Sequence, residues 1–393
     1  MMCPHVRDSA RNTRIGAIAL TAMTTWCLAL TPTGRSAAQT TTETPTTTSP
    51  APTTGPAPST PAPTPGPTTG PTTGLTTTGP TTTAGAASSN WTLLFGGDAL
   101  LTRPLRSGAD PFGRIRPPLA SADLAIVNVE TAISNRGRPE QKAYRFRSAP
   151  VFATLLAIAG VDAGSLANNH ARDYGADAML DTVAYLRQAG LRPVGAGATR
   201  TDALAPATFT IGTTRVAVLG ASQIVPNGGW VATADRPGIV NGHDLRTLTA
   251  AVRSARATHD VVVVVMHWGI EGDACPSGFQ RSTARALRAA GATAVLGAHP
   301  HVLQPVVVDG EGIIAYSLGN FIWDPRSGAA ADTGVLELRF SGSTLAGHRF
   351  YPHRLDGNGW AASVDPDSFA GRRISGRVAA RCGGAVGSAR SPG

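Results

Sequence analysis

The chain contains 393 residues, of which 42% are hydrophobic, enough for a sizeable core in one large domain or two ordinary ones. Its formal net charge of +9 comes largely from arginines near the two ends of the chain, so we expect the folded part to be close to neutral. This distribution argues against a nucleic-acid-binding protein.

Residues 1–38 are typical of a secretory signal peptide. Arg7, Arg11 and Arg14 precede the apolar stretch 15–30, and the small residues Ser36-Ala37-Ala38 supply a cleavage site. The apolar core is short for a membrane span and is diluted by threonine, so cleavage is favoured over retention as an N-terminal anchor. We therefore expect an exported protein of the cell envelope or the extracellular space.

Residues 39–89 predict a disordered linker. They are almost entirely Thr, Pro, Gly, Ala and Ser, and Glu43 is the only charged residue among them. Such a segment cannot bury enough apolar surface to offset its chain entropy. Its composition is typical of extended tethers and of O-glycosylated stalks.

Residues 90–352 predict a single α/β domain, because apolar strands alternate with helical patterns as in βαβ units. Helices are expected at 150–159, 176–189, 244–257 and 277–290. Two antiparallel pairs are expected, 208–211 with 215–219 and 302–308 with 312–317. The pattern indicates a layered sandwich built around a mainly parallel sheet.

Residues 353–393 are interpreted as a C-terminal extension that ends in a basic, Gly/Ala-rich tail. Its arginines are Arg372, Arg373, Arg377, Arg381 and Arg390, and no acidic residue follows Asp367. We expect this tail to be solvated and disordered. Cys275 and Cys382 are the only cysteines left after signal removal, so they are the only possible disulfide pair in an oxidising compartment, and whether they pair is left open.

Five predicted strands end in residues that can bind metals. Asp98 follows strand 92–95, Glu130 follows 124–127, Asn169 and His170 follow 163–167, His267 and Glu271 follow 261–266, and His299 and His301 follow 294–296. Ligands bind outside the carboxyl ends of strands in open α/β sheets, so these residues are expected to converge. His299-Pro300-His301 alone is equally compatible with a solvated turn. The five ends together predict a site for a divalent metal such as Mn, Zn or Fe.

The motifs occur in an order that resembles the CapA-type capsule (poly-γ-glutamate) synthesis family, over about Trp91 to Tyr351. They are Gly97-Asp98, Asn128-Val129-Glu130, Ser165-Leu166-Ala167-Asn168-Asn169-His170 with Asp173-Tyr174-Gly175, His267-Trp268-Gly269-Ile270-Glu271, Gly297-Ala298-His299-Pro300-His301 and Ser317-Leu318-Gly319-Asn320-Phe321. That family resembles a branch of the calcineurin-like metallophosphoesterases. The resemblance implies a four-layer α/β/β/α sandwich of metallophosphoesterase type, with two metals at strand ends.

The resemblance also implies roles for the site residues. The implied metal ligands are Asp98, Glu130 as the bridging carboxylate, Asn169, His267, His299 and His301, and the implied general acid is His170. Leu100 stands where the superfamily has a ligating histidine. One metal would keep Glu130, Asn169, His267 and His299, whereas the second would have only Asp98, Glu130 and His301. One metal is therefore expected, and a second is left open.

Several residues carry two readings. Glu271 either completes the second metal shell or is a solvated carboxylate. Asp173 either caps the following helix or buttresses His170. Asn320 either closes a loop or contacts substrate, and Arg103 and Arg145 are either surface residues or a clamp for an anionic substrate.

The resemblance leaves two functions open. One is a metal-dependent hydrolase acting on an anionic extracellular polymer such as poly-γ-glutamate, or on a phosphoester, with His170 protonating the leaving group. The other is a non-catalytic factor that binds the polymer or a membrane synthase complex. Leu100 favours the second function, and the otherwise near-complete ligand set favours the first.

Overall fold

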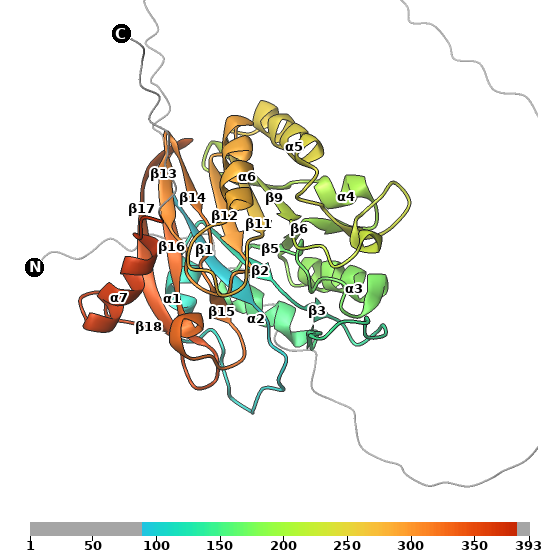
Figure 1. Ribbon diagram of the computed structural model, residues 1–393, viewed down its shortest axis with the longest axis horizontal. Coiled ribbons are helices and arrows are strands. Elements are labelled where there is room, and N and C mark those ends of the chain that lie inside the picture. The colour runs from blue at the N-terminus through green and yellow to red at the C-terminus, as the bar shows by residue number, and fades with distance from the viewer. Residues whose placement is uncertain (1–88, 383–393) are drawn as a thin grey trace, which may run out of the picture. The chain divides into compact units, whose positions relative to one another are not determined.

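The computed structural model describes residues 89–382. The predicted signal peptide, almost all of the predicted linker and residues 383–393 lie outside the described residues. Within 89–382, none of the helices combines the length and the apolar character needed to span a membrane. Two large β-sheets dominate this part of the chain (Figure 1).

The first sheet has eight strands in the order β18-β17-β16-β1-β2-β5-β6, with β15 beside β1. Its strands are β1 (Asn90–Ala99), β2 (Leu124–Val129), β5 (Ala163–Ser165), β6 (Arg192–Val194), β15 (Asn320–Ile322), β16 (Asp332–Ser341), β17 (Thr344–Leu355) and β18 (Ala361–Ser363). Strands β1, β2, β5 and β6 run parallel, and β16 pairs antiparallel with β1. The carboxyl ends of three predicted strands therefore lie along one edge.

The second sheet has six strands in the order β13-β14-β12-β11-β9-β8. Its strands are β8 (Ala207–Ile211), β9 (Thr214–Ser222), β11 (Val261–His267), β12 (Ala294–Ala298), β13 (Val306–Asp309) and β14 (Gly312–Ala315). The four central strands are parallel, and the two edge strands are antiparallel to their neighbours. Two short pairs complete the strands: β3 (Ala132–Ile133) with β4 (Arg147–Ser148), and β7 (Ala196–Gly197) with β10 (Gly238–Ile239).

The side chains of both sheets alternate between two hydrophobic cores, as the period of two in a β-strand requires. In β1, Leu93 and Phe95 enter the core between the sheets, whereas Leu94 packs toward helices. In β11, Val263 faces the same inner core and Val264 faces the helices on the other side. Each sheet thus has one face on the partner sheet and one under helices, which confirms the four-layer α/β/β/α sandwich.

The helices pack against the two sheets. They are α1 (Arg116–Ser121), α2 (Val151–Ala159), α3 (Gly175–Gln188), α4 (Arg200–Leu204), α5 (Leu245–Thr258), α6 (Gly278–Ala289) and α7 (Phe369–Val378), with 3₁₀ turns η1 (Gly228–Trp230) and η2 (Gly328–Ala331). Phe152 of α2 and Met179 of α3 pack on the first sheet, and Leu248 of α5 packs on the second. Figure 1 shows α5 and α6 outside the second sheet, and α7 at the opposite side beside β17.

The four predicted helices are confirmed to within one residue at each end, and the β8–β9 pair is confirmed, with β9 extending to Ser222, three residues past its predicted end. The second predicted pair is shorter than expected, because β13 begins only at Val306. Residues 301–305 instead continue the turn that follows β12, and Leu303 bridges to Leu318. The antiparallel strands β16 to β18 follow the last parallel unit and were not predicted as additions to the first sheet.

The C-terminal extension needs correction. Strand β17 continues past the predicted boundary at 352, and residues 369–378 form helix α7, so much of the expected disordered tail is folded. Ser368 caps the helix, and Ile374 and Val378 are buried in the core between the sheets. The local sequence suggests disorder because no acidic residue follows Asp367, whereas the negative partner of the helix arginines comes from a distant part of the chain.

That neutralisation centres on Asp332, which is fully buried. Arg354 on β17 and Arg373 and Arg377 on α7 form ion pairs with its carboxylate. A second link follows the helix, since Cys382 forms a disulfide with Cys275 in the loop after β11. Two links therefore hold α7 on the domain: the ion pairs of Arg373 and Arg377 with Asp332, and the disulfide that follows the helix.

Candidate metal centre

The carboxyl end of β1 places Asp98 in a fully buried position. Gly97 precedes it with a φ of 91°, and a Cβ at this position would collide with the carbonyl oxygen of Gly319, so glycine is required there. One carboxylate oxygen of Asp98 accepts a hydrogen bond from Asn128 Nδ2 at 2.8 Å, and the other accepts from the backbone N–H of His299 at 3.1 Å. Asp98 thus joins strand ends of both sheets.

Asn128 lies near the end of β2 and Glu130 directly follows the strand, two residues further along the chain. Both are fully buried. Asn128 Nδ2 lies 3.5 Å from a Glu130 oxygen and 3.2 Å from His267 Nδ1. Asn168 Nδ2 donates to Asn128 Oδ1 at 3.2 Å, which fixes the orientation of the Asn128 amide.

Strand β11 ends at His267, which is 1% exposed. Its Nε2 lies 2.7 Å from Asn169 Oδ1 and 3.4 Å from Glu130 Oε1. Three predicted ligands from three strand ends therefore meet within a few ångströms, in the interior of the protein.

The turn after β12 holds His299 and His301 in left-handed backbone conformations, with φ of 98° and 57°. Such values are unfavourable for residues with a Cβ and are retained where the surroundings enforce them, often at functional sites. The His299 ring lies 4.7 Å from the His267 ring, centre to centre. His301 Nδ1 lies 3.3 Å from Asp98 Oδ2, and its Nε2 lies 3.9 Å from Glu130 Oε1.

Two buried atoms at the centre of this cluster lack a hydrogen-bond partner among the described residues: Glu130 Oε1 and His299 Nδ1. Buried polar atoms are nearly always satisfied, so these atoms point to a bound group that supplies the missing interaction. Carboxylate, amide and imidazole groups are suitable ligands for a divalent transition metal. The donor set therefore fits a metal site.

The candidate ligand atoms form two groups that share Glu130, each compact enough to hold a metal ion. One group contains Asp98, Glu130 and His267, and the other contains Glu130, His299 and His301. The division implied by the resemblance, with Glu130, Asn169, His267 and His299 at one metal and Asp98, Glu130 and His301 at the other, stays a prediction. Leu100 is 1% exposed in the core under the helices, so it supplies no ligand.

Burial shifts the pKa values of the cluster toward neutral side chains. Burial, followed by the charge of Asp98, raises the pKa of Glu130 well above its ordinary value. Burial lowers the pKa of His267 well below its ordinary value, and burial together with His301 lowers the pKa of His299 to about 3. The lowered pKa values favour the neutral imidazoles of His267 and His299, which is the form that binds metals.

His170 lies beside the cluster, with its Nε2 4.0 Å from Glu130 Oε1. Its Nδ1 lies 2.6 Å from a carboxylate oxygen of Asp173, and the Phe146 ring stacks on the imidazole at 4.1 Å. Asp173 also accepts hydrogen bonds from Lys142 Nζ at 2.7 Å and from the backbone N–H of Phe146 at 2.6 Å. Asp173 thus buttresses His170, the second of its two readings, and no cap hydrogen bond links it to α3.

The remaining candidates lie at the edge of the cluster. Asn320 Oδ1 lies 2.9 Å from His301 Nδ1, while Asn320 Nδ2 donates to two backbone carbonyls, so Asn320 holds the His301 turn. Glu271 is exposed and joins neither ligand group, although its charge contributes to the raised pKa of Glu130. Arg103 pairs with Asp324 and donates to the Asn358 carbonyl, whereas Arg145 binds carbonyls of the loop that carries Lys142.

Two residues of the centre were given no role from the sequence. Asn128 was visible at a strand end, and its spacing of two from Glu130 was the signal for a shared face. Lys142 had no such signal, because it lies in an irregular loop and meets Asp173 only in the folded chain.

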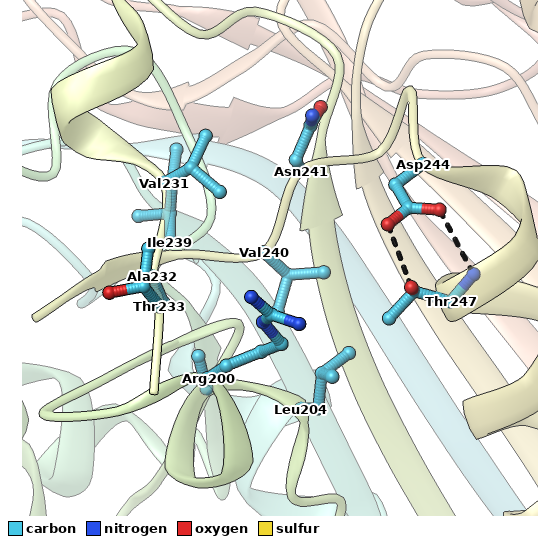
Figure 2. A pocket seen from close by; sticks show the side chains of 11 residues that line it. Arg200, Leu204, Val231, Ala232, Thr233, Ile239, Val240, Asn241, Asp244 and Thr247 are labelled. Carbon is cyan, nitrogen blue, oxygen red and sulfur yellow. Dashed lines mark hydrogen bonds between the residues drawn. The ribbon is translucent and has the colours of Figure 1, made fainter. Parts of the chain in front are cut away.

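A small cavity of about 140 Å³ lies elsewhere, between α4, β10 and the start of α5. Figure 2 shows its lining, in which Asp244 turns toward Thr247 to cap α5 and Arg200 extends beneath Val240. None of the predicted ligands lines this cavity, so it is separate from the metal centre.

Solved structures with a similar chain path include the NAD nucleotidase of Haemophilus influenzae, with a TM-score of 0.44, 11% identity, and coverage of 74% of this chain and 62% of that one. The 5′-nucleotidase of Candida albicans gives a TM-score of 0.40 and 13% identity, over 73% and 56% of the two chains. Values this low carry no inference about activity.

Sequence relatives are more informative. The capsule biosynthesis protein CapA of Bacillus anthracis is 32% identical over 269 residues, covering 65% of each chain. The PGA biosynthesis protein CapA of Bacillus subtilis is 31% identical over 252 residues, covering 62% of this chain and 66% of that protein. The match spans less than two thirds of the length of these relatives. The profile described as bacterial capsule synthesis protein PGA_cap matches residues 92–325. With its motifs assembled at the strand ends, this chain belongs to the PGA_cap family of bacterial capsule synthesis proteins.

Proposed function

We propose that this protein is an exported, metal-dependent hydrolase of poly-γ-glutamate capsule synthesis, acting on the anionic envelope polymer or on a phosphoester. The observation that carries the proposal is the pair of unpartnered buried atoms, Glu130 Oε1 and His299 Nδ1, with His170 beside them. The names of the Bacillus relatives support poly-γ-glutamate capsule as the polymer concerned. The signal-like residues 1–38 support export, with the segment either cleaved or kept as an anchor.

The metal-ligand roles are proposed for Asp98, Glu130, Asn169, His267, His299 and His301. Mn, Zn or Fe suits this mixture of imidazole and oxygen ligands. A bound metal would polarise the scissile group and lower the pKa of a coordinated water. One metal is the firmer part of the proposal, since Leu100 removes a ligand expected for a second.

His170 is proposed as the general acid. Asp173 accepts a hydrogen bond from Nδ1–H and stabilises the doubly protonated imidazolium, so Nε2 faces the cluster and, in that protonated form, would give its proton to the leaving group and leave a neutral imidazole. Lys142 neutralises the second oxygen of Asp173 and holds the carboxylate in place. His170 is 4% exposed, which keeps bulk water from competing for this proton.

A specific observation favours a second candidate, a non-catalytic factor that binds the polymer or assists a membrane synthase complex. Leu100 is a core residue, so one side of the cluster is poorer in ligands than a two-metal hydrolase needs. The relative from Mycobacterium tuberculosis, 29% identical over 229 residues, is named a probable polyglutamine synthesis accessory protein.

The deciding experiment compares metal content and hydrolysis in the same preparations. The full chain is reconstituted with Mn or Zn, its metal is measured by elemental analysis, and it is assayed on a phosphodiester and on γ-glutamyl oligomers. The hydrolase proposal predicts bound metal and turnover of one substrate class, with turnover lost in His170→Ala. Bound metal without turnover would favour the non-catalytic assembly factor. If no metal binds, both the hydrolase proposal and the proposed metal-ligand roles fail.

A further inference from the structure

Three loops meet on the His170 side of the metal centre. The loop 136–147 contacts the turn after β5, since Lys142 and Phe146 bind Asp173. The segment 228–237 contacts the same turn, because Arg172 donates to the carbonyls of Gly229 and Pro237. Lys142 also lies over the Trp230 ring, 5.4 Å from its centre. The three loops therefore form one continuous surface.

This surface carries a set of positive charges, here called the basic rim and defined as Lys142, Arg145, Arg147, Arg172 and Arg236. Each of the four guanidinium groups donates to two backbone carbonyls. Arg145 donates to those of Glu140 and Lys142, and Arg147 to those of Arg136 and Gly137. Arg172 donates to those of Gly229 and Pro237, and Arg236 to those of Gly228 and Val231. Within residues 89–382, no carboxylate forms an ion pair with any of the four.

The four arginine charges of the rim are therefore held in place by backbone carbonyls, whereas Lys142 pairs with Asp173. The Nε atoms of Arg147 and Arg172 are buried and lack hydrogen-bond partners in the described chain. Burial lowers the pKa of Arg172, and the nearby charge of Arg236 lowers it too, against the opposing effect of Glu140. Clustered like charges destabilise the folded protein, so their fixed arrangement indicates an anionic occupant.

We propose that the basic rim binds successive carboxylates of an acidic polymer and holds the polymer beside His170. Guanidinium groups suit carboxylates because they donate paired hydrogen bonds in a fixed plane. A chain with repeated charges engages cations on all three loops at once, and each additional contact raises the effective affinity. The identity of the polymer as a polyglutamate rests on the proposed function, whereas the rim rests on the contacts above.

A nucleic acid fits the rim less well than a polycarboxylate. Single-stranded nucleic acids bind through exposed aromatic rings on which bases stack. Phe146 is covered by His170, Trp230 is 2% exposed, and the Tyr174 ring is covered by Arg147, which leaves Tyr144 at 73% exposure as the one open ring of these loops.

The test measures polymer affinity, with no requirement for turnover. The full chain, treated with a chelator, is titrated with fluorescent poly-γ-glutamate and, separately, with polyphosphate of matched charge. The rim variant is Arg145→Gln with Arg236→Gln, both exposed side chains. The control, Arg246→Gln with Arg253→Gln, makes the same charge change on exposed positions of α5.

We expect the rim variant to bind poly-γ-glutamate about tenfold more weakly, about 1.4 kcal/mol, and the control to change affinity by less than about twofold. A third variant, Arg145→Lys with Arg236→Lys, keeps the charge and should recover most of the affinity, which separates binding from a folding defect. Equal losses in rim and control variants, or an unaffected rim variant, would overturn the proposal. Equally tight binding of polyphosphate would overturn the assignment to carboxylates. Rim-dependent binding without hydrolysis by the wild type would leave this inference intact and defeat the hydrolase proposal alone.

Discussion

The disulfide between Cys275 and Cys382 gives a stability prediction whose size follows from the fold. It closes a loop with a sequence separation of 107. In the unfolded chain, closing a loop of about 100 residues removes conformational entropy equivalent to about 4.7 kcal/mol at 25 °C. Measured effects generally fall below this limit, so the double variant Cys275→Ser, Cys382→Ser should lose about 2–4 kcal/mol of unfolding free energy.

The assay is urea denaturation of the oxidised wild type, the reduced wild type and the double variant, each fitted for midpoint and slope. The reduced wild type is the matched control, because it lacks the covalent link but keeps both native side chains. It should coincide with the double variant. Since the ion pairs of Asp332 still hold α7, we expect both proteins to remain folded without denaturant. A loss below about 0.5 kcal/mol in both would refute the argument that the link acts by restricting the unfolded chain.

Three further predictions concern single residues. His299→Ala should reduce metal content, whereas His170→Ala should retain metal and lose any hydrolysis. The reason is that His170 lies beside the candidate ligands and is not one of them. Equal metal loss in the two variants by elemental analysis would contradict these roles. Asp332→Asn should lower the unfolding free energy by about 3 kcal/mol in urea titrations, because three partly exposed arginines lose their common buried partner. An unchanged urea midpoint would argue against the Asp332–arginine cluster as the anchor of α7. Burial lowers the pKa of His353 in the folded protein, so the unfolded chain binds the proton more readily and stability falls as the pH drops below about 6.5. His353→Gln should reduce this pH slope by at most about 1.4 kcal/mol per pH unit, and an unchanged slope would show that His353 does not titrate on unfolding.

The sequence alone predicted the layered fold and most of the candidate ligands, because both follow from patterns within short stretches of neighbouring residues. The continuous apolar runs of β1 and β11, each followed by polar residues, indicate which residues are buried and where the strands end. Ligands bind outside the carboxyl ends of strands in open α/β sheets, so Asp98, Glu130 and His267, each at such an end, were expected to converge on one site.

The tertiary structure decided whatever depends on partners far apart in the chain. The arginines of α7 read as a disordered tail because their counter-charge, Asp332, lies 41 residues before Arg373. Lys142 was invisible for the same reason, since its partner Asp173 lies 31 residues away across two loops. The division of the ligands into two groups around Glu130 depends on how the second sheet packs on the first. Local patterns specify which residues are buried in a strand, but only packing between strands and loops determines which buried charges meet.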